Sequence, residues 1–279
     1  MAGVLLAGAV TATACRADSR SAQRPQPPST TTPPVSVTFA AATPSGRPAD
    51  TVQLASTTRV LQARLDAAGI RGGTISVASG TVRVTVPAAH WRQQVAVLLA
   101  APGRFELRPV LARAAATDPR RAFAAVDCTT TPPVAPPDKQ TVVCLQPQGA
   151  DSGAADADTK LLVGPAAITN NQIAAVAPPS RDPTGDWAVT IQLTEQGERT
   201  LQQLTATAAC QPAGSARRQI AMVLDGIALN SVAVAMEIPC RQGLIQARLS
   251  VSRLTEQQAR ALHALATSGP LPVRLQRQP

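Results

Sequence analysis

Two residue periodicities alternate in a fixed order between residues 35 and 110 and limit the folds open to this chain. Stretches in which apolar and polar residues alternate, as in strands, are separated by stretches with apolar residues three or four positions apart, as in helices. The strand-like stretches are "VSVTFAA", "TISVA", "TVRVTV" and "RFELRPV", and helix-like stretches follow the first and the third. This β-α-β-β-α-β order predicts a ferredoxin-like unit whose sheet is closed by "RFELRPV".

Turn and capping residues fit the same order. Asp50 is placed to cap the first helix and Gly69 to end it, with an inner face that includes Leu54, Leu61, Leu65 and Ala68. Ser79-Gly80 separates two alternating runs and predicts a hairpin. In the closing strand, Phe105 and Leu107 are expected to point inward.

A second α+β unit is predicted from residue 161 onward. "DWAVTIQLT" reads as a strand, Asp225-Gly226 predicts a hairpin, and "LIQARLSV" reads as a further strand that includes Ile245. Thr169 with Gln172, and Thr255 with Gln258, have the spacing of capping boxes. The predicted fold class is therefore α+β, with two ferredoxin-like units joined by a linker.

The first of the five cysteines closes an apolar N-terminus, "MAGVLLAGAVTATAC". Small residues before Cys15 are typical of a lipoprotein signal peptide, in which cleavage leaves the thiol to be lipidated. However, no Lys or Arg precedes Cys15, and the apolar part spans only Val4 to Val10. A start annotated too far downstream would explain both departures, and an uncleaved apolar N-terminus is the alternative. Lipidation of Cys15 would anchor the chain to a membrane.

The other four cysteines allow three pairings. We favour Cys128–Cys144 and Cys210–Cys240, because each pair lies within one apparent subdomain. Disulfides imply an oxidising compartment, which agrees with the signal peptide. Both features place the protein on the extracytoplasmic side of the cell membrane, held there by its lipid.

Composition and motifs exclude several classes of function. Aromatic residues make up 2% of the chain and Tyr is absent, so a base-stacking surface is not expected and no nucleic-acid partner is predicted. The net charge of +9 fits a solvated basic surface, or attraction to anionic lipid head groups. The two histidines, His90 and His263, stand apart from any catalytic or metal-binding motif. We therefore predict no enzyme activity, no metal and no cofactor.

The order of several motifs in the second unit is similar to the large extracytoplasmic domain of SecD, a subunit of the protein-export translocase. The junction Leu193-Thr194 with Gly197, the hairpin "MVLDG" and the turn "GPLP" stand in the family's order. The first unit resembles the same family in its helix, hairpin and closing strand. In SecD this turn leads into a transmembrane bundle, whereas no apolar run of 18 residues follows Cys15 here. The resemblance thus implies a freestanding ectodomain without the bundle.

These observations predict five segments. They are a signal peptide (1–14), a Pro/Ser/Thr-rich disordered tether (15–34), a SecD-like base subdomain (35–112), a disulfide-pinned insertion and linker (113–160), and a SecD-like head subdomain (161–279).

The resemblance implies that the head contacts exported, unfolded polypeptides or translocase subunits. Such binding needs exposed apolar side chains or an available strand edge. The segment "NSVAVAMEIP" and the strand after it supply the candidate binding residues Val232, Val234, Met236 and Ile245. The other interpretation of that segment is a core strand or a loop tethered by Cys240. The alternative function is an accessory or structural cell-envelope lipoprotein that holds a folded protein partner or lipid.

Overall fold

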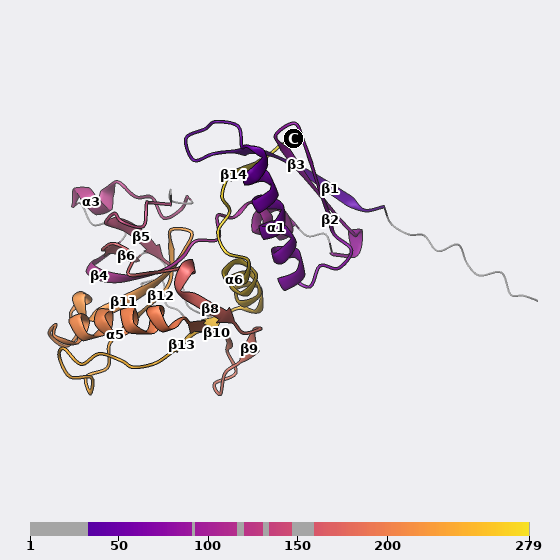
Figure 1. Cartoon of the computed structure of the whole chain (residues 1–279). Coiled ribbons are helices and arrows are strands. Elements are labelled where there is room, and N and C mark those ends of the chain that lie inside the picture. The colour runs from indigo at the N-terminus through magenta and orange to yellow at the C-terminus, as the bar shows by residue number, and fades with distance from the viewer. Residues whose placement is uncertain (1–32, 91–92, 116–119, 131–133, 147–158, 279) are drawn as a thin grey trace, which may run out of the picture. The chain divides into compact units, whose positions relative to one another are not determined.

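The computed structural model describes residues 33–278, apart from 91–92, 116–119, 131–133 and 147–158 (Figure 1). The predicted signal peptide, with Cys15 and most of the tether, lies outside the described residues. All described residues belong to one unit, Pro33–Pro279. Its α+β class agrees with the prediction.

The first sheet has the strand order of a ferredoxin-like fold, β14-β1-β3-β2. Its strands are β1 (Val35–Ala42), β2 (Thr74–Ala78), β3 (Thr81–Val86) and β14 (Arg274–Arg277), and its helices are α1 (Thr51–Ala67) and α2 (Gln93–Ala100). The inner faces of β1, β3 and β14 meet these helices in an apolar core that includes Phe39, Leu61, Leu65, Val82, Val84 and Leu275.

Local signals placed these elements correctly. The Asp50 side chain accepts a hydrogen bond from the Gln53 N–H at 2.7 Å, and the Gln53 side chain accepts one from the Asp50 N–H at 3.0 Å, which completes a capping box. Gly69 follows α1 with φ of 71°, and the Ser79-Gly80 turn has φ of 47° and 76°. Both central residues of that turn are left-handed, as a two-residue hairpin requires.

The strand predicted to close this sheet lies elsewhere, and the C-terminal strand takes its place. β4 (Phe105–Ala115) pairs with β11 (Gln219–Leu224), whereas Ala41 of β1 pairs with Leu275 of β14. The physical reason is burial on both faces of β4. Its first residues, Phe105 to Arg108, are all buried, because Glu106 and Arg108 neutralise each other through a contact of 2.6 Å. β14 alternates exposed and buried residues at its start, which suits a sheet with one solvent face.

The second region does not form the single ferredoxin-like sheet that we predicted. β4, β11 and β12 (Ile227–Ala233) join β5 (Thr141–Leu145) and β6 (Thr159–Val163) in a closed ring, with β7 (Ile168–Thr169) attached to β4. The ring encloses Val110, Val143, Leu145, Leu161, Val163, Ala221, Val223 and Ala228. β5 comes from the segment predicted as an insertion and linker (113–160), and β6 spans the predicted boundary between that segment and the head. The domain boundaries at 112 and 161 stay a prediction.

A third sheet has the order β13-β10-β8, with β9 (Ser180–Arg181) beside β10. Its strands are β8 (Ile173–Val176), β10 (Trp187–Leu193) and β13 (Arg248–Leu254). Helices α5 (Glu195–Ala209) and α6 (Glu256–Ser268) contribute to the same core, which holds Val189, Ile191, Leu201, Leu249, Val251 and Leu262. The short elements are α3 (Arg121–Ala124) and the 3-10 turns Ala88–His90, Asn170–Gln172 and Ala216–Arg218.

Both predicted capping boxes of the second region form, at Thr169 with Gln172 and at Thr255 with Gln258. The Asp225-Gly226 hairpin joins β11 to β12. The strand predicted as "LIQARLSV" begins only at Arg248, so Ile245 precedes it.

Candidate functional site

The candidate binding residues lie at the end of β12 and in residues 234–247, which we call the α5 loop because it is bonded to α5. The loop begins beside Arg218, a buried side chain that donates to the carbonyls of Val234 and Ala235, each at 2.9 Å. Arg218 also donates to the carbonyls of Ala209 and Gln211 at the C-terminal end of α5. One buried guanidinium thus holds the start of the loop against the end of the helix.

Further contacts fasten the rest of the loop. The Arg241 N–H donates to the Ala206 carbonyl at 3.2 Å, and the Leu244 N–H donates to the buried Thr205 hydroxyl at 2.8 Å. Gly243 has φ of 71°, and a Cβ there would stand 2.1 Å from the Gln202 carbonyl oxygen. Only glycine allows this approach, so the path of the loop along α5 is fixed by sequence.

The four candidate side chains do not share one environment. Met236 is 62% exposed, Ile245 is 73% exposed and Val232 is 49% exposed. Val234 is 5% exposed and belongs to the main core, which corrects the expectation that its side chain is exposed for binding. β12 ends at Ala233, and Arg218 turns the chain there, which breaks the alternation that grouped Val234 with its neighbours.

The disulfide Cys210–Cys240, which is one of the two pairings favoured from the sequence, links the end of α5 to the loop. Replacing both cysteines with Ser should lower the free energy of unfolding by about 3–4 kcal/mol, since the closed loop spans 30 residues. The same variant should be cut faster by trypsin at the exposed Arg241. Urea unfolding and limited proteolysis of the oxidised protein measure both effects. Unchanged values for both would contradict this role of the bond.

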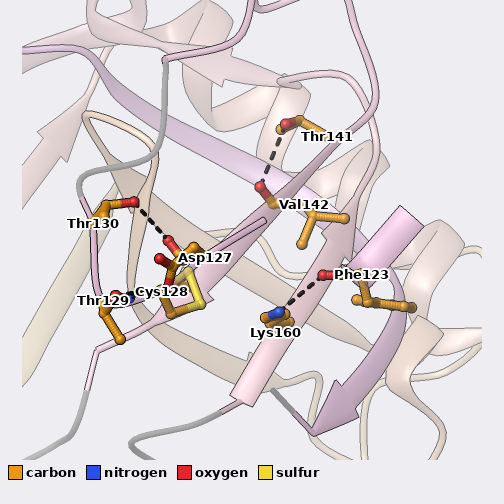
Figure 2. Close-up of a disulfide and its surroundings, with 9 residues drawn as sticks. Phe123, Asp127, Cys128, Thr129, Thr130, Thr141, Val142 and Lys160 are labelled. Atoms are coloured by element: carbon orange, nitrogen blue, oxygen red, sulfur yellow. Dashed lines mark hydrogen bonds between the residues drawn. A yellow bond between two sulfur atoms is a disulfide. The ribbon is translucent and has the colours of Figure 1, made fainter. Parts of the chain in front are cut away.

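The second disulfide, Cys128–Cys144, fastens the segment after α3 to β5 (Figure 2). Beside it, the buried Lys160 ammonium donates to the Phe123 carbonyl at 2.9 Å. Hydrogen bonds from the Thr129 N–H and hydroxyl hold the pKa of the Asp127 carboxyl below its usual range. These contacts organise the segment around the disulfide, so we assign them a structural role.

Sequence reasoning missed a buried polar junction between α1 and two connecting segments. One segment joins α2 to β4, and the other joins α6 to β14. The Arg64 guanidinium is fully buried and donates to carbonyls at the end of α2 and beyond, and to the Ser268 hydroxyl and the Gly269 carbonyl after α6. Burial lowers the pKa of Arg64 to about 10, against the opposing attraction of Asp225. The sequence signal for this junction was a single arginine beside the apolar face of α1.

Asp225 completes this junction from the β11–β12 turn. Its carboxylate accepts hydrogen bonds from the Gly103 and Arg104 N–H groups at 3.0 and 2.7 Å. Burial raises the pKa of Asp225, and those two hydrogen bonds together with Arg64 act in the opposite direction. Arg64 and Asp225 therefore fix the path of the chain between the first sheet and the ring.

An apolar groove of about 780 Å³ runs between α2 and the N-terminal half of α6. Its floor includes Ile70, Val95, Leu98, Ala101, Ala261 and Leu265. Glu256 and Arg260, which form an ion pair, stand at its side together with Gln94 and Gln257. The groove offers shape and apolar surface, and its charged side chains neutralise each other.

The described residues do not assemble a recognisable catalytic group. No cluster of three or more His, Cys, Asp or Glu side chains suited to a metal ion occurs among them. His263 lies on α6, and burial lowers its pKa, while a hydrogen bond to the Ala177 backbone opposes that shift. In the part of the chain that the structure describes, no helix has both the length and the apolar character needed to cross a membrane.

Residues 147–273 match the family described as "SecDF, P1 head subdomain". A crystal structure of SecDF in its super-membrane-facing form is similar over 88% of this chain, at 17% identity and a TM-score of 0.56. This chain spans 29% of the length of that SecDF chain. A second structure, of "a membrane component SecDF that enhances protein export", is similar over 87% of this chain and 97% of its own length, at 17% identity and a TM-score of 0.53. No curated protein has a significant match.

The two comparisons fit the observed topology. The match to the head subdomain begins before β6 and ends just before β14. It therefore spans the third sheet and part of the ring, and leaves the first sheet outside. The structural similarity extends over most of the chain and, at this identity, establishes the fold.

Proposed function

We propose a role in protein export for this chain, whose residues 147–273 match the SecDF P1 head subdomain family. It is a non-enzymatic lipoprotein at the extracytoplasmic face of the membrane, where it binds or escorts exported polypeptides near the translocase. One of the similar structures is that of a membrane component that enhances protein export, which supports the process. The observation that carries the proposal is the α5 loop, which presents exposed Met236 and Ile245 on a fixed path.

The chemistry of these side chains suits a partner without a defined fold. Met is unbranched and polarizable, so it adapts to side chains of different shape. Holding the loop in place removes part of the entropy that binding would otherwise cost. A fixed loop with adaptable apolar side chains favours weak, sequence-tolerant contacts with extended chains.

A double variant with Met236→Asp and Ile245→Asp should bind a reduced, unfolded model secretory protein about tenfold more weakly. The loss is expected because apolar contact area is removed and negative charge is added. The measurement is a dissociation constant from fluorescence anisotropy, with the full chain. The matched control is Val52→Asp, since Val52 is 75% exposed on α1, away from the loop. Equal loss in both variants would contradict a role for the α5 loop.

The predicted anchor is tested by Cys15→Ser in cells. Lipidation adds about 0.8 kcal/mol of membrane affinity for each buried CH₂ group, so losing the acyl chains should release the protein from the membrane fraction. Fractionation and metabolic labelling with a fatty acid report the change. Retention of the Cys15→Ser variant in the membrane fraction would indicate an uncleaved apolar N-terminus.

The groove between α2 and α6 favours the second candidate function, an accessory envelope lipoprotein that holds one folded partner or a lipid. Its apolar floor fits a helix face or acyl chains. Replacing Leu98 in the floor with Gln should abolish capture of such a partner and leave the binding of unfolded chains intact. Unchanged capture by the Leu98→Gln variant would exclude the groove as the binding site.

A further inference from the structure

Most strands in the second region have neighbours on both sides, but β13 does not. Closure of the ring leaves β5, β6, β11 and β12 each with two partners and β4 with three. β13 stands at the end of the third sheet, and β10 is the one strand that it pairs with among the described residues. An edge strand of this kind presents unpaired backbone groups.

The register shows which backbone groups of β13 point outward. The Leu193 N–H donates to the Ala247 carbonyl at 2.7 Å, and Ile191 stands opposite Leu249 in the same register. In an antiparallel pair, hydrogen-bonded and non-hydrogen-bonded residues alternate along the strand. Ala247, Leu249 and Val251 therefore bond to β10, whereas Arg248 and Ser250 turn both N–H and C=O away from it. We call these outward groups the β13 edge.

The β13 edge is accessible. Arg248 and Ser250 are both exposed, and no hydrogen bond within the described chain involves their backbone groups. Ile245, 73% exposed, precedes the edge by three residues, so apolar surface and unpaired backbone lie along one stretch of chain. A docked strand gains affinity from main-chain hydrogen bonds and specificity from neighbouring side chains.

The charges along the edge select the partner. Arg248 and Arg253 are exposed on β13, and Arg241 is exposed in the preceding loop. A second copy of the chain, paired edge to edge, would bring arginines against arginines, which is destabilising. An extended segment with carboxylates would instead form charge-assisted hydrogen bonds with these guanidinium groups. The net charge of +9 would also speed the approach of such a segment.

We propose that the β13 edge binds an extended, acidic segment of another polypeptide as an added strand. The inference rests on the proposed binding of unfolded chains, and it names the class of segment that is bound. Such a segment places backbone groups opposite Arg248 and Ser250 and carboxylates near Arg248 and Arg253.

The first test uses two labelled synthetic peptides, one alternating Glu with Val and one alternating Lys with Val, and the full chain. The acidic peptide should bind about tenfold tighter or more, since charge pairs at an interface carry that much discrimination. Arg248→Glu should weaken the binding of the acidic peptide about tenfold, whereas Arg59→Glu, at an exposed position of α1, should not. Equal affinity for both peptides, or equal loss in both variants, would overturn the proposal.

The second test addresses the backbone. Ser250→Pro removes an N–H that makes no bond to β10, and proline is tolerated at such edge positions. The acidic peptide should lose about tenfold in affinity to Ser250→Pro and almost none to Ser250→Ala. Hydrogen exchange should show that bound peptide protects the Arg248 and Ser250 amides of the unmodified chain, which keeps the test valid if Ser250→Pro unfolds. Absence of that protection would overturn the added strand.

The outcomes separate this inference from the proposed function. If the unfolded secretory protein binds but the acidic peptide does not, the β13 edge is excluded and the export proposal stands. If neither binds, both fail.

Discussion

Replacing Arg64 with Met should lower the free energy of unfolding by about 3–5 kcal/mol, because it leaves buried carbonyl oxygens without donors. Arg64 is fully buried and donates to the carbonyls of Leu98, Leu99, Ala101, Pro102 and Gly269, as well as to the Ser268 hydroxyl. Methionine fills similar volume but donates nothing, and it leaves Asp225 with one positive neighbour fewer. Urea unfolding at neutral pH measures the change.

Arg59→Met is the matched control, since Arg59 is exposed on the same helix. Its effect should stay within about 0.5 kcal/mol. Hydrogen exchange in Arg64→Met should also speed up at residues 101–104 and 269–271, which belong to the two connecting segments that Arg64 joins. An equal effect of the two substitutions would mean that the junction contributes little to stability.

Replacing Val234 with Asp should unfold the second region, at a cost of about 4 kcal/mol or more, because a carboxylate would enter an aliphatic core without a partner. Val234 is 5% exposed and packs in the core that also holds Ile220, Leu229 and Leu249. Circular dichroism and urea unfolding report the loss.

Met236→Asp, two residues further on, should leave the fold intact within about 0.5 kcal/mol, since this side chain is 62% exposed. Comparing Val234→Asp with Met236→Asp thus separates the effect of burial from the effect of position in the sequence. A folded Val234→Asp variant with unchanged unfolding midpoint would show that Val234 is accessible after all.

The elements could be predicted wherever their signals are local. Capping boxes at Asp50, Thr169 and Thr255 need contacts across only three residues, and all three form. The Ser79-Gly80 and Asp225-Gly226 turns are likewise set by the conformational preferences of two residues. Because each of these signals lies within one turn, the sequence alone suffices to identify it.

Strand pairing could not be predicted in the same way, because it joins residues far apart in the chain. "RFELRPV" and "VRLQR" both alternate, and nothing local distinguishes which one pairs with β1. The alternate charges Glu106 and Arg108 suggest a solvent face, yet they are buried as an ion pair inside the protein. Because Glu106 and Arg108 pair with each other, β4 can lie where both of its faces are covered.

The predicted binding segment holds both exposed and buried side chains, which the sequence pattern did not separate. The alternation of Val232, Val234 and Met236 assumed a strand that continues through all three. β12 ends at Ala233, because Arg218 binds the next two carbonyls and redirects the chain. Arg218 lies 16 residues before Val234, so a pattern of neighbours could not reveal the contact.

The proposed function requires that the α5 loop contacts exported polypeptides. The most direct measurement is site-specific photo-crosslinking in intact cells, with probes at Met236 and Ile245 and a control probe at Arg59. We expect crosslinks to many different secretory proteins from the two loop positions and few from Arg59. Crosslinks from the loop to one folded envelope protein, or identical products from all three positions, would contradict it.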